Sequence, residues 1–247
     1  MQASPAGAVI ILGIVLIFLV CWLIAGRIRI VSRSYNREKD RLIRRQIAFS
    51  LEESAPIHLD IGGSGEGGLS GGAMLSAAEA TETVSAQMAF ADEPWMITAS
   101  NGIGAAYEKD SVQTGMDAAD YGNSFDSDCT AFSGVVPASH LAGNASALEM
   151  KPSALHLSMG AFGSISALSD TACSKGDILC IAGDDLISQA VGTVTADAVY
   201  IGEQFAEIPD SLSRKEKKDP ALLAMDVFRW VVIAAVAVFT VMGLRGI

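Results

Sequence analysis

The segment that decides the fold is IHLDI at 57–61, together with the glycine-rich run GGSGEGGLSGG that follows it at 62–72. The first part is a short apolar run typical of a β-strand, and the glycines end it. After Pro56, further strand-like runs alternate with stretches of small residues that favour helices. This order predicts an α/β domain with a mainly parallel sheet, built as a Rossmann-like three-layer sandwich.

The predicted elements alternate along the chain, as they do in βαβ units. The expected strands are Ile57–Ile61, Trp95–Ala99, Cys129–Val135, Leu155–Met159, Ile178–Ala182 and Ala198–Ile201. The expected helices lie at about 73–91, 101–116, 138–149, 161–175 and 185–196.

Glycine and small polar residues follow several of these strands, as in SNGIG at 100–104, GAFG at 160–163 and GDD at 183–185. Such turns gather at the carboxyl edge of a parallel sheet, where ligands bind at the switch point. Glycines let backbone N–H groups approach a ligand, and a helix N-terminus behind a turn favours an anion. We therefore expect a phosphate or carboxylate site there, formed by Gly63, Gly65, Gly68, Ser100, Asn101, Gly160 and Gly163.

The glycine spacing does not identify a cofactor. Gly63, Gly65 and Gly68 satisfy G-x-G-x-x-G, but so dense a glycine run matches the pattern by chance. Glu66 puts a negative charge where a pyrophosphate would lie, and the acid expected after the second strand is absent. A phosphate-binding G-x-x-x-x-G-K-[ST] loop is also absent. Tight strand–helix turns, or close contact with another subunit, are the favoured explanation of the glycines.

The sequence nominates no catalytic residue and no metal ligand. His58, His140 and His156 are scattered, and the first and last fall within apolar strands, where a hydrogen-bonded core histidine is expected. The acidic residues between Asp117 and Asp128 lack the spacing of an EF-hand, so a solvated loop is expected. The four cysteines form no C-x-x-C pair. An enzyme is therefore the less favoured interpretation.

Two apolar segments near the ends of the chain suggest membrane spans. AVIILGIVLIFLVCWLIAG at 8–26 has no charged residue, and VFRWVVIAAVAVFTVMGL at 227–244 is apolar from Trp230 onward. Each has the length expected of a spanning helix. Between them, basic residues cluster next to both segments, eight of them between Arg27 and Arg45. The positive-inside rule then predicts a cytoplasmic central domain, with both termini on the outer side of the cell (inner) membrane.

The charge of the chain is strongly partitioned. The net charge is −11, but residues 46–212 contain three basic and twenty-three acidic residues, a net of −20. Such a domain should avoid nucleic acid. Residues 31–53 bring Leu42, Ile43, Ile47 and Leu51 to one side at helical spacing, which predicts a basic amphipathic stalk helix. The predicted division of the chain is 1–26 (first span), 27–55 (stalk), 56–212 (acidic α/β domain) and 213–247 (basic linker and second span).

The stretch IAGDDLISQAVGTVTADAVYIGEQFAE at 181–207, with AMDVFRW at 224–230, resembles an uncharacterised family of bacterial membrane proteins. The features that carry the resemblance are the His58–Gly63 strand end, the Ala182–Asp185 turn, the Ile201–Ala206 segment, and Asp226 with Arg229. The resemblance implies two terminal transmembrane helices around an α/β domain. It implies no catalytic residue.

Two functions follow as hypotheses. The first is a membrane-anchored, non-enzymatic scaffold that self-associates into a homo-oligomer, with the lipid bilayer and other membrane-complex subunits as partners. The second is a membrane-tethered sensor or binding subunit that holds a small anionic or nucleotide-like ligand at the glycine-rich edge. The identity of any cofactor is unknown at this stage.

Overall fold

The structure is a computed structural model of the 247-residue chain, and it divides into two compact units. One unit comprises Met1–Arg33 with Arg214–Ile247, and the other comprises Ser34–Ser213. The structure describes residues 13–20, 22–23, 37–63, 71–91, 95–134, 136–151, 153–161, 178–183, 186–213 and 220–244.

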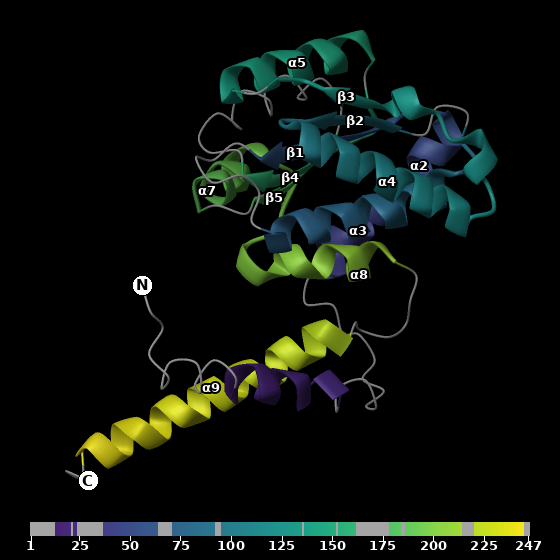
Figure 1. Cartoon of the computed structure of the whole chain (residues 1–247). Coiled ribbons are helices and arrows are strands. Elements are labelled where there is room, and N and C mark those ends of the chain that lie inside the picture. Colours follow the sequence, from purple (N-terminus) through teal and green to yellow (C-terminus); the bar gives the residue numbers. More distant parts are fainter. Residues whose placement is uncertain are drawn as a thin grey trace. The chain divides into compact units, whose positions relative to one another are not determined.

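The unit 34–213 is an α/β fold around a six-stranded sheet with the order β3-β2-β1-β4-β5-β6 (Figure 1). Every neighbouring pair in this sheet is parallel. The expected α/β class with a parallel sheet is confirmed. The strands are β1 (Ile57–Gly63), β2 (Trp95–Ala99), β3 (Thr130–Phe132), β4 (Leu155–Ala161), β5 (Ile178–Gly183) and β6 (Ala198–Val199).

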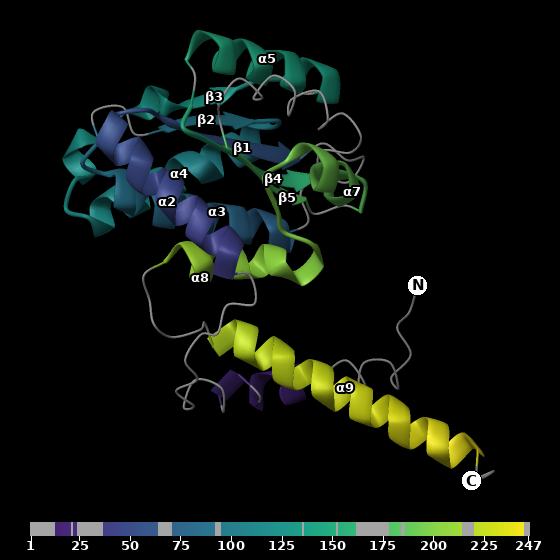
Figure 2. The same cartoon turned by 180° about the vertical axis from the view of Figure 1, so that it is seen from behind.

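Helices flank the sheet, and Figure 1 shows α5 on one side of the strands with α3 and α4 on the other. In the view from behind, α2 runs in front of α3 and next to α8 (Figure 2). The helices of this unit are α2 (Arg37–Glu53), α3 (Gly71–Met88), α4 (Gly102–Ala118), α5 (Pro137–Met150), α7 (Leu186–Thr195) and α8 (Ile208–Leu212), with short 3-10 turns at η1 (Gly122–Ser124), η2 (Ser127–Cys129) and η4 (Gly202–Glu207).

One face of the sheet forms an apolar core. Ile57, Leu59 and Ile61 of β1 are buried on this face, because successive side chains of a strand point to opposite faces of the sheet. Leu157 on β4 and Ile97 on β2 lie in register with Leu59, so the three form a row. Side chains from α2, α3, α4 and α8 complete this cluster, with Ile43, Val84, Val112 and Leu212 among them.

The amphipathic helix expected over 31–53 is described from Arg37 to Glu53 as α2. Its Ile43 and Ile47 are buried in the core of the α/β unit. Leu42 packs against the core from its margin, whereas Leu51 is exposed. The apolar stripe of this helix therefore packs against the α/β domain itself.

The predicted elements match most of the observed ones within a few residues. The third strand is an exception, because it begins at Thr130 and already ends at Phe132. Ser133 and Gly134 follow it as irregular backbone, with φ +152° at Gly134. The predicted helix at 161–175 lies outside the described residues, except for Ala161, the last residue of β4.

The prediction of two membrane spans was wrong. Within the part of the chain that the structure describes, no helix is both long and apolar enough to cross a membrane. The last helix, α9 (Pro220–Leu244), contains Asp226 and Arg229. Its charge-free part begins at Trp230 and is about 22 Å long, against about 30 Å for a hydrocarbon core.

The first apolar run is described as helix at 13–20 and 22–23, and the rest of the run lies outside the described residues. The expected cell-membrane location depended on both spans. So did the cytoplasmic side for the domain, the outer side for the termini and the insertion of the domain between two spans. Without the spans, these expectations are wrong as well. The positive-inside rule does not apply either, so the basic clusters beside the two segments give no orientation.

A buried carboxyl group lies between α3 and α4. Glu108 on α4 is fully buried, and neither of its oxygens makes a hydrogen bond of ordinary geometry. Burial raises the pKa of Glu108 to about 7, although the nearby Thr81 hydroxyl opposes the rise. The folded state therefore holds a proton on Glu108 that the unfolded chain releases near pH 4.5.

We predict that Glu108 makes the fold less stable as pH rises from 4.5 to about 7, because the native state binds the proton more tightly. Glu108→Gln should raise the free energy of unfolding at pH 8 by up to about 3 kcal/mol and change it little at pH 4.5. Urea unfolding at both pH values measures this difference. The exposed Glu149→Gln is the matched control, and an equal effect of both changes contradicts the prediction.

Candidate functional site

The second face of the sheet is polar and buried. His58 and Asp60 of β1 point away from the apolar core, as do His156 and Ser158 of β4 and Thr98 of β2. Each of the five is at most 3% exposed. Polar side chains at such depth need hydrogen-bond partners, and here they find them in one another and in α5.

Seven side chains form one continuous hydrogen-bonded chain, which we call the polar relay. It runs in the order Ser158, His156, His58, Thr98, Asp60, His140 and Ser133. Five positions on three strands contribute to it, together with one helix and the turn after β3. Of its members only Ser133 is partly exposed, and the other six are buried.

The first half of the polar relay links the two histidines of neighbouring strands. His58 Nδ1 lies 2.6 Å from His156 Nδ1, because the register places these residues side by side. The other nitrogen of His156, Nε2, is 2.8 Å from Ser158 Oγ. His58 Nε2 is 2.9 Å from Thr98 Oγ1. Both nitrogens of each ring are therefore used.

The second half converges on a single carboxylate oxygen. Thr98 Oγ1 lies 3.2 Å from Asp60 Oδ1, and His140 Nε2 lies 2.8 Å from the same oxygen. Ser133 Oγ contacts His140 Nδ1. The second carboxylate oxygen, Oδ2 of Asp60, is buried without a hydrogen-bond partner.

The ionised state of Asp60 fixes the direction of each hydrogen bond. A carboxylate only accepts, so the Thr98 hydroxyl and the His140 Nε2–H both donate to it. Thr98 must then accept from His58 Nε2–H, which leaves His58 Nδ1 to accept from His156 Nδ1–H. The same logic makes Ser158 donate to His156 and Ser133 donate to His140 Nδ1. All bonds of the polar relay thus point toward Asp60.

The pKa directions agree with this assignment. Burial alone raises the pKa of Asp60, but the hydrogen bond from His140 and the charges of the histidines bring it down to about 2. Burial lowers the pKa of His156 to about 4 and that of His58 well below its usual value. A neutral pair of rings beside an ionised carboxylate is the state that the hydrogen bonds require.

Glycines hold Ser133 close to α5. Gly134 has φ +152°, a conformation that side chains disfavour, and a Cβ there would lie 2.3 Å from Ser139 Oγ. On α5, a Cβ at Gly143 would lie 2.6 Å from the carbonyl oxygen of Ser133. The turn from strand to helix is therefore tight enough to place Ser133 against His140.

Four of the seven expected ligand residues lie at the carboxyl edge of the sheet. Gly63 ends β1, and Gly160 lies near the end of β4 with φ +123°. Ser100 is buried just after β2 and its N–H donates to Ile61 O. Asn101 caps α4 through a 2.6 Å bond from Gly104 N–H. Gly65, Gly68 and Gly163 lie outside the described residues.

The strand register adds a feature that the sequence did not predict. Gly62 of β1 pairs with Gly160 of β4, which pairs with Gly183 of β5. Three neighbouring strands therefore carry glycine at the same level of the carboxyl edge. The backbone there lacks side chains, so a ligand can approach it closely.

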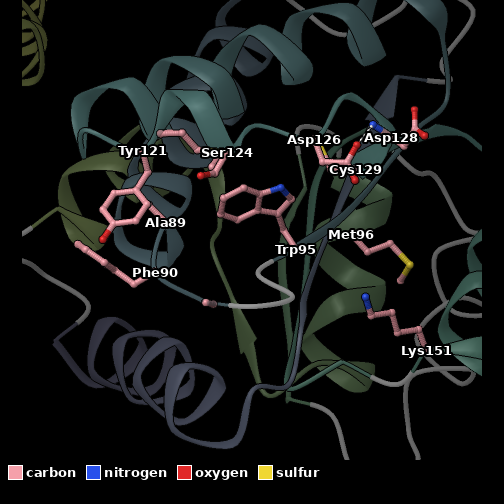
Figure 3. Close-up of a pocket in the computed structure, with 12 residues that line it drawn as sticks. Ala89, Phe90, Trp95, Met96, Tyr121, Ser124, Asp126, Asp128, Cys129 and Lys151 are labelled. Carbon is pink, nitrogen blue, oxygen red and sulfur yellow. Dashed lines mark hydrogen bonds between the residues drawn. The ribbon is translucent and has the colours of Figure 1, made fainter.

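A cavity of about 680 Å³ lies at the opposite, amino edge, where β2 begins. Figure 3 shows Trp95 near its centre, with Phe90 and Tyr121 together on one side and Met96 and Lys151 on the other. It contains none of the expected ligand residues. Asp126 and Asp128, from the acidic stretch expected to be a solvated loop, also line it, and Asp126 Oδ1 accepts from Asp128 N–H.

His58 and His156 are buried and hydrogen-bonded, as the strand pattern suggested. The sequence did not reveal that they meet, nor that His140 joins Ser133 to Asp60. The available signal was the recurrence of a polar residue at every second position of IHLD and LHLS. Among the described residues, no group of three or more His, Cys, Asp or Glu side chains is arranged to hold a metal ion.

No family model matches the chain, and neither a curated protein nor a solved structure is significantly similar to it. The resemblance to a bacterial membrane-protein family is therefore wrong. No family model supports it, and the two terminal spans that it implies are not found among the described helices.

We predict that the polar relay destabilises the fold as pH falls from 6.5 to about 4. The unfolded chain binds protons on His58 and His156 in this range, whereas the folded chain resists them. The contribution of His156 amounts to about 3 kcal/mol at most.

The slope of the unfolding free energy against pH measures this effect, best in a Glu108→Gln background because Glu108 acts in the opposite direction. His156→Gln should reduce the slope. Thr98→Val is the control, because it removes hydrogen bonds from the polar relay without removing a titratable group. An unchanged slope in His156→Gln contradicts the assignment.

Proposed function

We propose that the α/β unit binds a small anionic, nucleotide-like ligand at the carboxyl edge of its sheet. The observation that carries this proposal is the glycine row Gly62, Gly160 and Gly183 at the ends of β1, β4 and β5. These strands lie at the point where the chain reverses its direction across the sheet, between β1 and β4. Crevices at such switch points are where open α/β sheets bind ligands.

The strand order supports a nucleotide-like occupant. The order 3-2-1-4-5-6 is that of doubly wound, Rossmann-like dinucleotide-binding folds, and we assign the domain to this three-layer type. The 17-residue helix α4 begins at the same edge directly after Ser100 and Asn101. Its N-terminus contributes a favourable field for an anion.

The binding proposal predicts that a phosphate-bearing compound stabilises the fold. At 100-fold excess over Kd, ADP or inorganic phosphate should raise the thermal midpoint by about 5–10 °C. Gly62→Val should abolish the shift, because a branched side chain then occupies the place where the ligand meets the backbone.

Ala118→Val is the matched control, since Ala118 is exposed in the last turn of α4, away from the carboxyl edge. It should keep the full thermal shift. The proposal fails if neither compound shifts the wild-type midpoint, or if both variants keep the shift.

Self-association is a second candidate function, and one helix favours it. On α7, Ser188, Gln189 and Gly192 face the protein, whereas Leu186 is 82% and Val194 is 87% exposed. A helix normally turns its apolar residues inward. This reversed arrangement provides an apolar face for a second copy of the chain, in keeping with a scaffold that forms homo-oligomers.

We therefore expect wild-type protein to elute as an oligomer in size-exclusion chromatography with light scattering. Leu186→Glu with Val194→Glu should shift it to the mass of one chain, because charges would be buried in the contact. Thr114→Glu makes the same kind of change at an exposed polar position of α4, away from α7, and should leave the oligomer intact. A single-chain mass for the wild type at all concentrations excludes this function.

A further inference from the structure

We propose that Ser133 is a nucleophile for acyl transfer, with His140 as its general base and Asp60 as the group that orients the imidazole. The proposal goes beyond ligand binding at the carboxyl edge and does not depend on it. Its substrate class is an ester or thioester of a carboxylic acid, and water is the second substrate.

The hydrogen-bond directions carry this inference. Ser133 O–H donates to His140 Nδ1, while His140 Nε2–H donates to Asp60 Oδ1 at 2.8 Å. A hydroxyl, an imidazole and a carboxylate linked in this order form the arrangement that activates serine in many hydrolases. The arrangement is recognised by geometry and not by position in the sequence.

The burial pattern gives each group the environment that its role needs. Asp60 and His140 are 1% and 4% exposed, so their interaction is shielded from water. Ser133 is only half-buried, directly after β3 and thus at the carboxyl edge. Ser133 is therefore the member of the polar relay that is partly accessible from outside.

The local backbone explains why the hydroxyl and the imidazole meet. Ser133 and His140 are separated by one tight turn, whose geometry depends on Gly134 and on the close approach of Gly143. The Ser133 N–H donates to Ala99 O, which anchors the backbone beside β2. The 3.4 Å contact from Ser133 Oγ to Ala99 O is the weaker alternative for the hydroxyl proton.

The reaction balances with these groups alone. The Ser133 oxygen bonds to the acyl carbon while its proton moves to His140 Nδ1, and the bond from the acyl carbon to the leaving group breaks as that proton passes to the leaving group. Water then attacks the acyl-serine, gives one proton to His140 Nδ1 and releases the acid, and the proton returns to the Ser133 oxygen. Asp60 stays ionised and holds His140 Nε2–H throughout.

The remaining members of the polar relay act through Asp60. Thr98 donates to the same oxygen as His140 and receives a bond from His58. They are positioning residues, because they set the place of the carboxylate and touch no reacting atom.

The test is covalent labelling of the full chain with a fluorophosphonate, followed by peptide mass spectrometry. Wild-type protein should carry the label on Ser133. Ser133→Ala should lose it, and Asp60→Asn should lower the labelling rate about 100-fold or more. Ser139→Ala is the matched control, because Ser139 hydrogen-bonds to the backbone of Val136 and lies outside the polar relay.

Two further variants keep the test decisive where a substitution disturbs folding. Ser133→Cys retains a side chain at the site and should react with iodoacetamide faster than Cys129. His140→Ala should lose turnover of p-nitrophenyl acetate and regain part of it with added imidazole, which a purely structural histidine would not show. An unlabelled wild type, or equal labelling of Ser133→Ala, overturns the proposal. Because labelling needs no anionic ligand, it can succeed where the phosphate experiment fails.

Discussion

The ionised carboxylate of Asp60 is the constraint on which the polar half of the domain depends. It accepts from Thr98 and from His140 on one oxygen, and these two bonds determine the tautomer of each histidine beyond them. A neutral acid at this position would donate instead of only accepting. The direction of each hydrogen bond in the polar relay, from Ser158 to Ser133, would then be undefined.

The two faces of the sheet differ in role: one forms the apolar core, and the other carries the polar relay. The face toward α3 and α4 is apolar and close-packed, and at Gly115 a Cβ would lie 2.4 Å from Glu82 O. Such packing leaves little freedom for polar groups. The face toward α5 carries the histidines and Asp60. Each strand contributes side chains to both faces because successive side chains alternate. Packing on the apolar face therefore fixes the strand backbone, and the backbone in turn fixes the positions of the polar side chains.

The strands were predictable from sequence because their signal is local. IHLDI, WMITA and LHLSM are short apolar runs followed by glycine or serine, and each forms a strand that begins at the predicted residue. The membrane spans were predicted from hydropathy alone. That criterion gave too little weight to Asp226 and Arg229, which shorten the uncharged part of α9.

The site was less predictable because it depends on register. His58 and His156 are 98 residues apart, and only the pairing of β1 with β4 brings their rings together. The glycine row has the same origin, since Gly62, Gly160 and Gly183 come from three separate segments. Ser133 with His140 is closer in sequence, but the turn geometry at Gly134 that joins them has no signature in the residue types alone.

Stability does not account for the polar relay. A buried hydrogen-bonded network contributes little more than apolar side chains of the same volume, and Asp60 Oδ2 is left without a hydrogen bond. The opposite face shows that this sheet can bury an apolar surface. The polar relay buries a carboxylate, three histidines and several hydroxyls, and Ser133 is its partly exposed member. Burying these groups costs desolvation energy, as in an active site, and their hydrogen bonds are arranged to activate the Ser133 hydroxyl.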